Sequence, residues 1–322
     1  MNPLHYPNPL VNFRADPWIY RHTDGKYYYT ATVPSYDRIE LVIADTISGV
    51  AEAMPQTVWR KHKTGIMSNL IWAPEIHFIQ GKWYIYFAAA HTEAPHPIHN
   101  TFQHRMYVLE ADSPYDKWIE LGSIDTGMDS FCLDATVFIW KDRLYYLWAQ
   151  KDITIWGNSN VYIAEMRNPW TLMSQPVLLT KPEYDWECSV IPVCEAPSVL
   201  IHNRKIFLTY SANATGPEYC IGLLRADGDS DLLNPESWIK SPTPVFQSCV
   251  ENRKYGPGHN SFTVAEDGKT PILVYHVRDT DDITGDPLRN PGRHTCVQPF
   301  YFDEKDSPIF GKPLPVNKND PK

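Results

Sequence analysis

The feature of this 322-residue chain that most constrains its fold is a strand pattern that recurs five times. In each copy a polar turn leads into an apolar run that is rich in aromatic residues. The five turns begin at Asp24, Gln80, Lys141, Asn203 and Asp267. Self-similarity at a near-constant spacing is typical of architectures in which each copy is one supersecondary unit.

A second strand type lies just upstream of each run. The upstream strands begin at Asp16, Trp72, Asp134, Glu195 and His259, which are 56, 62, 61 and 64 positions apart. A third strand follows in several units, beginning at Glu40, Met106, Asn160 and Cys220. A unit of about sixty residues with three or more strands has the size of a propeller blade with long loops.

A β-sandwich also contains many short strands, but it does not repeat one strand type at a near-constant interval. We therefore predict an all-β fold, a five-bladed β-propeller that forms a single domain over residues 1–322. Its inner strands are expected to start near residues 16, 72, 134, 195 and 259.

Composition supports this fold and narrows the partners. Aromatic residues make up 13% of the chain and there are 28 prolines, which favours short strands joined by tight turns. The net charge of -9 argues against a nucleic-acid partner. No apolar run is long enough to span a membrane, and residues 1–10 lack the pattern of a secretory signal. We expect a cytoplasmic protein with free cysteines, or a secreted one if the chain is a processed form.

The inner strands of a propeller run beside its axis, so equivalent positions converge at one mouth. Here those positions hold Asp16, Trp72, Asp134, Glu195 and His259. Packing three carboxylates together carries desolvation and like-charge costs, which favours function over structure. Glycoside hydrolysis needs a carboxylic acid that protonates the leaving oxygen and a carboxylate that activates water or attacks. A third carboxylate can hold the pKa of the acid high by repulsion.

Each of these residues taken singly also has a structural interpretation. Asp16 fits a turn or cap, and Asp134 and Glu195 fit hydrogen-bonded strand ends. Trp72 fits a core aromatic, although at the mouth its flat face can stack on a sugar ring. His259 fits a structural histidine, or a ligand of water or a hard cation. Their equivalence in the repeat favours catalysis.

The ordered set of motifs resembles glycoside hydrolase family 43 over about residues 10–310. The motifs read Arg-Ala-Asp-Pro from Arg14, Trp-Ala-Pro-Glu-Ile-His from Trp72, Asp-Ala-Thr-Val-Phe from Asp134, Glu-Ala-Pro-Ser-Val from Glu195 and Gly-Pro-Gly-His-Asn-Ser-Phe from Gly256. The resemblance implies a five-bladed propeller that hydrolyses glycosides with inversion.

The resemblance also implies roles for single residues. Asp16 resembles the general base, Glu195 the general acid, and Asp134 the residue that orients the acid and raises its pKa. His259 resembles an axial histidine that binds a calcium or sodium ion directly or through water. No organic cofactor is implied.

The stretches that begin at Tyr275, Gly285 and Gly292 look most like the branch that acts on α-L-arabinofuranosides and 1,5-linked arabinan. We therefore expect an exo-acting enzyme on arabinan or arabino-oligosaccharides, with Trp72, Asn160 and Arg293 as substrate-binding residues. That branch predicts an arginine directly after Thr295, where this chain has Cys296. The change removes a bidentate donor, so that either Arg293 compensates or the subsite differs.

Four alternatives stay open beside this interpretation: a β-xylosidase or an endo-arabinanase of the same family, a retaining transfructosidase or invertase, and a non-catalytic carbohydrate-binding propeller. The retaining enzymes normally carry an Asn-Asp-Pro-Asn-Gly motif, whereas Asp16 is followed by Pro17 and Trp18. Three converging acids argue against a binding module. Whether the mouth is a closed pocket or an open groove decides between exo and endo action.

Overall fold

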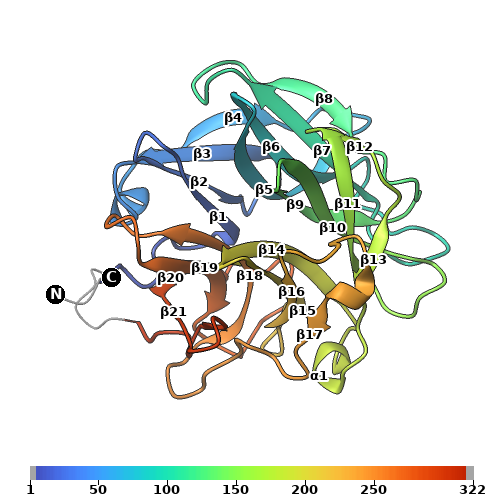
Figure 1. Ribbon diagram of the computed structural model, residues 1–322. Helices are drawn as coiled ribbons and strands as arrows, with labels where there is room; N and C mark the ends of the chain where they lie inside the picture. Colours follow the sequence, from blue (N-terminus) through green and yellow to red (C-terminus); the bar gives the residue numbers. More distant parts are fainter. Residues whose placement is uncertain (1–4, 317–322) are drawn as a thin grey trace.

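The computed structural model describes residues 5–316 as five β-sheets arranged around a central axis (Figure 1). The predicted all-β, five-bladed propeller is thereby confirmed. Residues 1–4 and 317–322 of the expected single domain lie outside the described residues.

Each blade is an antiparallel sheet, and its first strand in sequence lies beside the axis (Figure 1). The strands of blade one are β1 (Ala15–Arg21), β2 (Tyr27–Thr32), β3 (Arg38–Ala44) and β4 (Gln56–Arg60). Those of blade two are β5 (Asn69–Ile79), β6 (Lys82–Ala90), β7 (His104–Ala111) and β8 (Ile119–Ser123). Those of blade three are β9 (Cys132–Trp140), β10 (Arg143–Gln150), β11 (Asn160–Asn168), β12 (Thr171–Leu172) and β13 (Val177–Thr180).

The last two blades complete the ring. The strands of blade four are β14 (Cys194–His202), β15 (Lys205–Ala212), β16 (Cys220–Asp227) and β17 (Ile239–Lys240). Those of blade five are β18 (Tyr255–Val264), β19 (Pro271–Arg278) and β20 (His294–Pro299). The remaining elements are the hairpin β21 (Tyr301–Phe302) and β22 (Pro308–Ile309), the helix α1 (Asp185–Cys188), and the 3-10 helices η1 (Ser48–Ala51) and η2 (Pro235–Ser237).

The apolar runs of the repeat form the second strand of each blade. Strands β2, β6, β10, β15 and β19 are buried almost throughout, without the alternation of a half-exposed strand. Neighbouring blades pack against both faces of these strands, so both sets of side chains enter hydrophobic clusters. This two-sided burial explains why the runs read as continuous apolar sequence.

The N-terminal segment closes the ring on blade five. The backbone N–H of Leu10 donates to the carbonyl of Thr295 at 2.8 Å, and the N–H of Thr295 donates to the carbonyl of Val11 at 2.9 Å. The segment that precedes blade one therefore pairs with the last strand of blade five. Within residues 5–316, no helix has the length and apolar character needed to cross a membrane.

Candidate active site

Every inner strand contains an extra residue close to its start, and β5 and β18 contain a second one. In β1 the pairing with β2 shifts between Ala15 and Trp18, and the other four blades show the same shift. The bulge that all five blades share contains a residue other than glycine with a positive φ; these residues are Asp16 (56°), Ala73 (46°), Asp134 (54°), Ala196 (49°) and His259 (45°). This conformation costs an L-residue about 1–2 kcal/mol. Such bulges re-aim side chains and are frequent beside active sites.

The positions of the bulges show that the five strand starts aligned from the sequence repeat are not all equivalent. Asp16, Asp134 and His259 are bulged residues, as expected, but the bulges of blades two and four fall on Ala73 and Ala196. Trp72 and Glu195 therefore lie one position upstream of the other three residues. A one-residue bulge leaves no mark in the apolar pattern, so the repeat does not reveal this offset.

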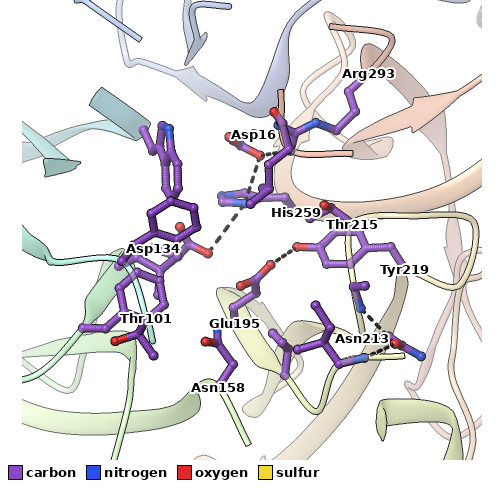
Figure 2. Close-up of a pocket in the computed structure, with 18 of the residues that line it drawn as sticks. Asp16, Thr101, Asp134, Asn158, Glu195, Asn213, Thr215, Tyr219, His259 and Arg293 are labelled. Atoms are coloured by element: carbon purple, nitrogen blue, oxygen red, sulfur yellow. Dashed lines mark hydrogen bonds and ion pairs between the residues drawn. The ribbon is translucent and has the colours of Figure 1, made fainter. Parts of the chain in front are cut away.

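The bulges surround a cavity of about 420 Å³ at one end of the axis. Its wall includes Asp16, Trp72, Asp134, Glu195 and His259, together with Arg293. Figure 2 shows Asp16, Asp134, Glu195 and His259 directed toward one another. The structure thus brings together six of the seven predicted site residues.

The seventh predicted residue, Asn160, is not among the residues that line this cavity. It begins β11, is buried, and donates its side-chain amide to the carbonyl of Gln150 at 3.3 Å. Asn158, in the loop just before this strand, lines the cavity instead. The position of a loop residue depends on the path of the loop, which the strand pattern does not indicate.

Asp16 lies among hydrogen-bond donors and cationic or imidazole groups. The hydroxyl of Thr32 donates to its Oδ2 at 2.6 Å, and Nη1 of Arg293 lies 3.4 Å from its Oδ1. His259 Nδ1 and His276 Nδ1 each lie 3.3 Å from the same Oδ1. Burial alone would raise the pKa of Asp16, but these neighbours outweigh it and hold the pKa well below its usual value. Asp16 is therefore ionised at neutral pH.

Asp134 and Glu195 lie in an environment that raises their pKa values, in contrast to Asp16. Asp134 Oδ2 accepts the backbone N–H of Ala196 at 3.1 Å, and Glu195 Oε1 accepts the hydroxyl of Tyr219 at 2.8 Å. Burial raises the pKa of Asp134 well above its usual value, and the charge of Glu195 raises it further. Burial likewise raises the pKa of Glu195 to about 7, with Asp16 adding to the rise and Tyr219 opposing it. At neutral pH this pair of acids retains a proton beside the ionised Asp16.

Trp72 packs as a core aromatic residue and also lines the cavity. Its indole stacks on the imidazole of His104 at 4.0 Å between ring centroids, and Phe102 packs against it edge-on at 5.0 Å. It also lines the cavity, where an indole provides an apolar wall for a sugar ring.

His259 is a poor candidate for directly binding a calcium ion. Its Nδ1 faces Asp16 Oδ1 at 3.3 Å and Asp134 Oδ2 at 3.8 Å, and burial lowers its pKa. No group of three or more His, Cys, Asp or Glu side chains within residues 5–316 is placed to hold a metal ion. Calcium takes six to eight oxygen ligands, so these side chains do not fit direct ligation.

Cys296 does not alter this cavity. Its side chain is fully buried in the hydrophobic cluster between blades four and five, and its Sγ lies 2.9 Å from Asn8 Oδ1. Arg293, by contrast, lines the cavity and contacts Asp16. The arginine expected after Thr295 is therefore replaced at a position outside the cavity wall.

Sequence reasoning missed three residues whose side chains contact the carboxylates: Thr32, Tyr219 and His276. Tyr219 lies in a loop before β16, and Thr32 and His276 lie in apolar runs, so none of them belongs to a repeated polar position. The stretch that begins at Tyr275 includes His276 but does not indicate its contact with Asp16. A search for polar residues inside otherwise apolar second strands would have found it.

Known proteins share this fold and much of the sequence. The chain matches the sequence profile of Glycosyl hydrolases family 43 over residues 6–308. It is 49% identical over 312 residues to "Extracellular exo-alpha-(1->5)-L-arabinofuranosidase" of Streptomyces avermitilis. The match covers 96% of this chain and 64% of that protein. Its identity to the protein of the same name from Streptomyces chartreusis is 48% over 288 residues, or 88% of this chain and 86% of that one.

A solved structure is closer in sequence. The alpha-L-arabinofuranosidase from Lactobacillus brevis is 57% identical, superimposes with a TM-score of 0.96, and is matched over 98% of both chains. This chain spans only 64% of the length of three of the curated relatives that it matches. The match to the family profile covers nearly the whole chain, so this chain belongs to glycosyl hydrolases family 43.

Proposed function

We propose that this chain hydrolyses α-L-arabinofuranosidic bonds with inversion and releases arabinose from the ends of 1,5-linked arabinan or arabino-oligosaccharides. This proposal rests on one observation: the carboxyl groups in this cavity have pKa values shifted in opposite directions, so that one is ionised and another protonated. Asp16 has a strongly lowered pKa, whereas Glu195 has a pKa raised to about 7. An ionised base beside a protonated acid is what hydrolysis of a glycosidic bond requires.

In this mechanism Asp16 is the general base and Glu195 the general acid. Asp16 takes a proton from water as that water attacks the anomeric carbon, while Glu195 gives its proton to the leaving oxygen. Asp134 does not react. Its ionisation and that of Glu195 oppose each other, which keeps a proton on the pair at neutral pH.

Arg293 has a supporting role in the proposal. Its guanidinium contacts Asp16 Oδ1, and its second terminal nitrogen reaches the carbonyl of Leu288 at 3.4 Å. Because Arg293 also lines the cavity, it is placed to orient both the base and a sugar hydroxyl.

The proposal of arabinose as the substrate sugar rests on the relatives. The Lactobacillus brevis protein is named an alpha-L-arabinofuranosidase, and both Streptomyces proteins are named for exo action on α-(1->5) linkages. The identity of 57% over 98% of both chains supports the same substrate class here.

The rim of the cavity supports exo action. The loop after β6 contributes Pro95 and residues 100–102 to its wall, and the loop before β20 contributes Leu288 and Arg293. Arg289 joins these loops by an ion pair with Glu93 at 3.0 Å. The two loops are thereby joined beside the cavity, which favours a pocket for a chain end over an open groove.

Product analysis on linear 1,5-arabinan tests this function. Release of arabinose alone, from the first time points onward, is the expected result. A ladder of oligosaccharides would show endo action, xylose released from xylo-oligosaccharides would show a β-xylosidase, and binding without any product would show a non-catalytic propeller.

The axial ion and the compartment are separate parts of the proposal. With direct ligation disfavoured, a calcium or sodium ion would be held by His259 through water, which elemental analysis of the purified protein tests. Two relatives are named extracellular, which supports secretion, while the six free cysteines fit the cytoplasmic location predicted from the sequence. Fractionation of the source cells with an antibody to this chain distinguishes the two compartments.

A further inference from the structure

Tyr219 is a buried residue with a hydroxyl directed at Glu195. It lies immediately before β16, only 1% of its surface is exposed, and its hydroxyl donates to Glu195 Oε1 at 2.8 Å (Figure 2). Its ring stacks on the imidazole of His276 with the centroids 5.5 Å apart and the planes inclined by 3°. Both its polar end and its flat face are therefore engaged.

His276, the second ring of this stack, contacts Asp16, the proposed base. His276 Nδ1 accepts the backbone N–H of Asp16 at 3.1 Å and lies 3.3 Å from Asp16 Oδ1. Contacts therefore run without a gap from Glu195 through Tyr219 and His276 to Asp16. The acid and the base are joined by one pair of stacked rings.

Two glycines of the Gly-Pro-Gly motif make room for this arrangement. A Cβ on Gly258 would lie 2.2 Å from Cε1 of Tyr219, so any larger residue would displace the ring. Gly256 has a φ of 60°, and a Cβ there would lie 2.2 Å from the carbonyl oxygen of Gly216 in the loop that carries Tyr219. The motif is thus shaped to accept Tyr219 and its loop.

We propose that Tyr219 is a positioning residue that orients Glu195 and, through its stack on His276, fixes the placement of Glu195 relative to Asp16. This inference rests on the proposed function, in which Glu195 is the acid and Asp16 the base. Tyr219 itself does not touch the reacting atoms.

A role in positioning has an electrostatic signature. The charged and titratable groups that face Glu195 are Asp16 on β1, Asp134 on β9, Arg293 before β20 and Tyr219 itself. The hydroxyl of Tyr219 donates to the ionised carboxylate and so lowers the pKa of Glu195. Loss of this donor raises that pKa, whereas loss of the negative charge of Asp134 lowers it.

The test compares wild-type protein with Tyr219→Phe, which keeps the stacking ring. Activity requires protonated Glu195 and is lost as pH rises through its pKa, so the alkaline limb of kcat/KM should move up by about one pH unit. We expect kcat/KM on arabino-oligosaccharides to fall on the order of ten-fold at the pH optimum. An aryl arabinoside with a good leaving group, which hardly needs the acid, should lose less.

Two further variants make this test specific. Gly258→Ala keeps the hydroxyl but pushes the ring of Tyr219 aside, and it should move the alkaline limb in the same direction. Tyr28→Phe is the matched control, because the hydroxyl of Tyr28 also donates to a carboxylate, Asp24 Oδ2, at 2.8 Å but outside the cavity. It should leave the pH profile unchanged.

A direct titration separates this inference from the proposed function. Carbon-13 NMR of labelled glutamate side chains, with the Glu195 signal assigned from Glu195→Gln, reports the pKa of Glu195 without any turnover. A higher pKa in Tyr219→Phe supports the inference even if wild-type protein releases no arabinose, a result that would refute only the proposed function. An unchanged pKa and an unchanged alkaline limb in folded Tyr219→Phe would overturn the inference while leaving the function intact.

Discussion

The backbone N–H of Ala196, the residue after Glu195, donates to Asp134 Oδ2 across the boundary between blades four and three at 3.1 Å. Three other bulges make the same kind of contact with the preceding blade. These contacts are Ala73 to the hydroxyl of Thr32 at 2.8 Å, His259 to the hydroxyl of Ser211 at 2.7 Å, and Asp16 to the imidazole of His276 at 3.1 Å. Each such bulge therefore satisfies its N–H with a side chain of the preceding blade, which offsets part of its strain.

Replacing the proposed base or acid should abolish most of the activity. Asp16→Asn removes the ionised carboxylate and Glu195→Gln removes the transferable proton, so each should lower kcat on arabino-oligosaccharides by on the order of 10²-fold or more. Steady-state kinetics with the purified variants measure this loss.

The two variants should differ on an activated aryl arabinoside. Glu195→Gln should retain more of its rate there, because a good leaving group needs little protonation, whereas Asp16→Asn should stay impaired. Circular dichroism melts control for folding. A variant that keeps more than about a tenth of the wild-type rate on a poor leaving group would show that its role is misassigned.

The stereochemistry of the product is a second prediction. With Asp16 activating a water molecule and not bonding to the sugar, the first product should have the anomeric configuration opposite to that of the substrate. Proton NMR of the earliest arabinose anomer, recorded before mutarotation, measures this. Early formation of the retained anomer would point to a covalent intermediate.

The five inner strands could be predicted because the strands of each blade are buried in the same pattern. Both faces of the second strands are covered, so their aromatic runs recur, and the polar starts of the inner strands recur with them. The bulges could not be predicted, because one inserted residue changes the backbone and not the apolar pattern. Hence Ala73 and Ala196, with small side chains and no chemistry, are equivalent to Asp16 and Asp134.

Residues outside the repeat could not be predicted for a different reason. Asn158 and Tyr219 lie in loops, and their positions depend on loop paths that no periodicity records. The two glycines that accept Tyr219 belong to the Gly-Pro-Gly motif, but the ring that needs the space is about forty residues away in sequence.

Glu75 should make the stability of the protein depend on pH. It is buried, and its Oε2 lies 3.0 Å from Nε2 of His77, a histidine that burial holds neutral. Burial raises the pKa of Glu75 well above the ordinary value of 4.5. The folded protein thus keeps a proton that the unfolded chain releases, so the free energy of unfolding falls as pH rises above about 4.5.

Glu75→Gln mimics the protonated side chain and removes this penalty. The variant should therefore melt a few degrees higher than wild type at pH 8, with little difference at pH 4. Thermal melts at both pH values test this, and Glu52→Gln on the exposed surface is the control. An equal difference at both pH values would exclude protonation of Glu75 as the cause.

Asp134 should tune the acid without reacting. It and Glu195 are buried together, and the charge of Glu195 raises the pKa of Asp134. Because the repulsion between two carboxylates is mutual, a charge on Asp134 also opposes ionisation of Glu195. Asp134→Asn removes that charge while its side-chain oxygen can still accept the N–H of Ala196. The pKa of Glu195 should then fall, so that the alkaline limb of kcat/KM moves to lower pH, opposite to the shift expected for Tyr219→Phe.

Asp142→Asn, at a turn residue of the same blade that also has a positive φ of 61°, controls for the backbone. A wild-type alkaline limb in Asp134→Asn, or an equal loss on an aryl arabinoside and on arabinan, would instead assign Asp134 as the base or nucleophile.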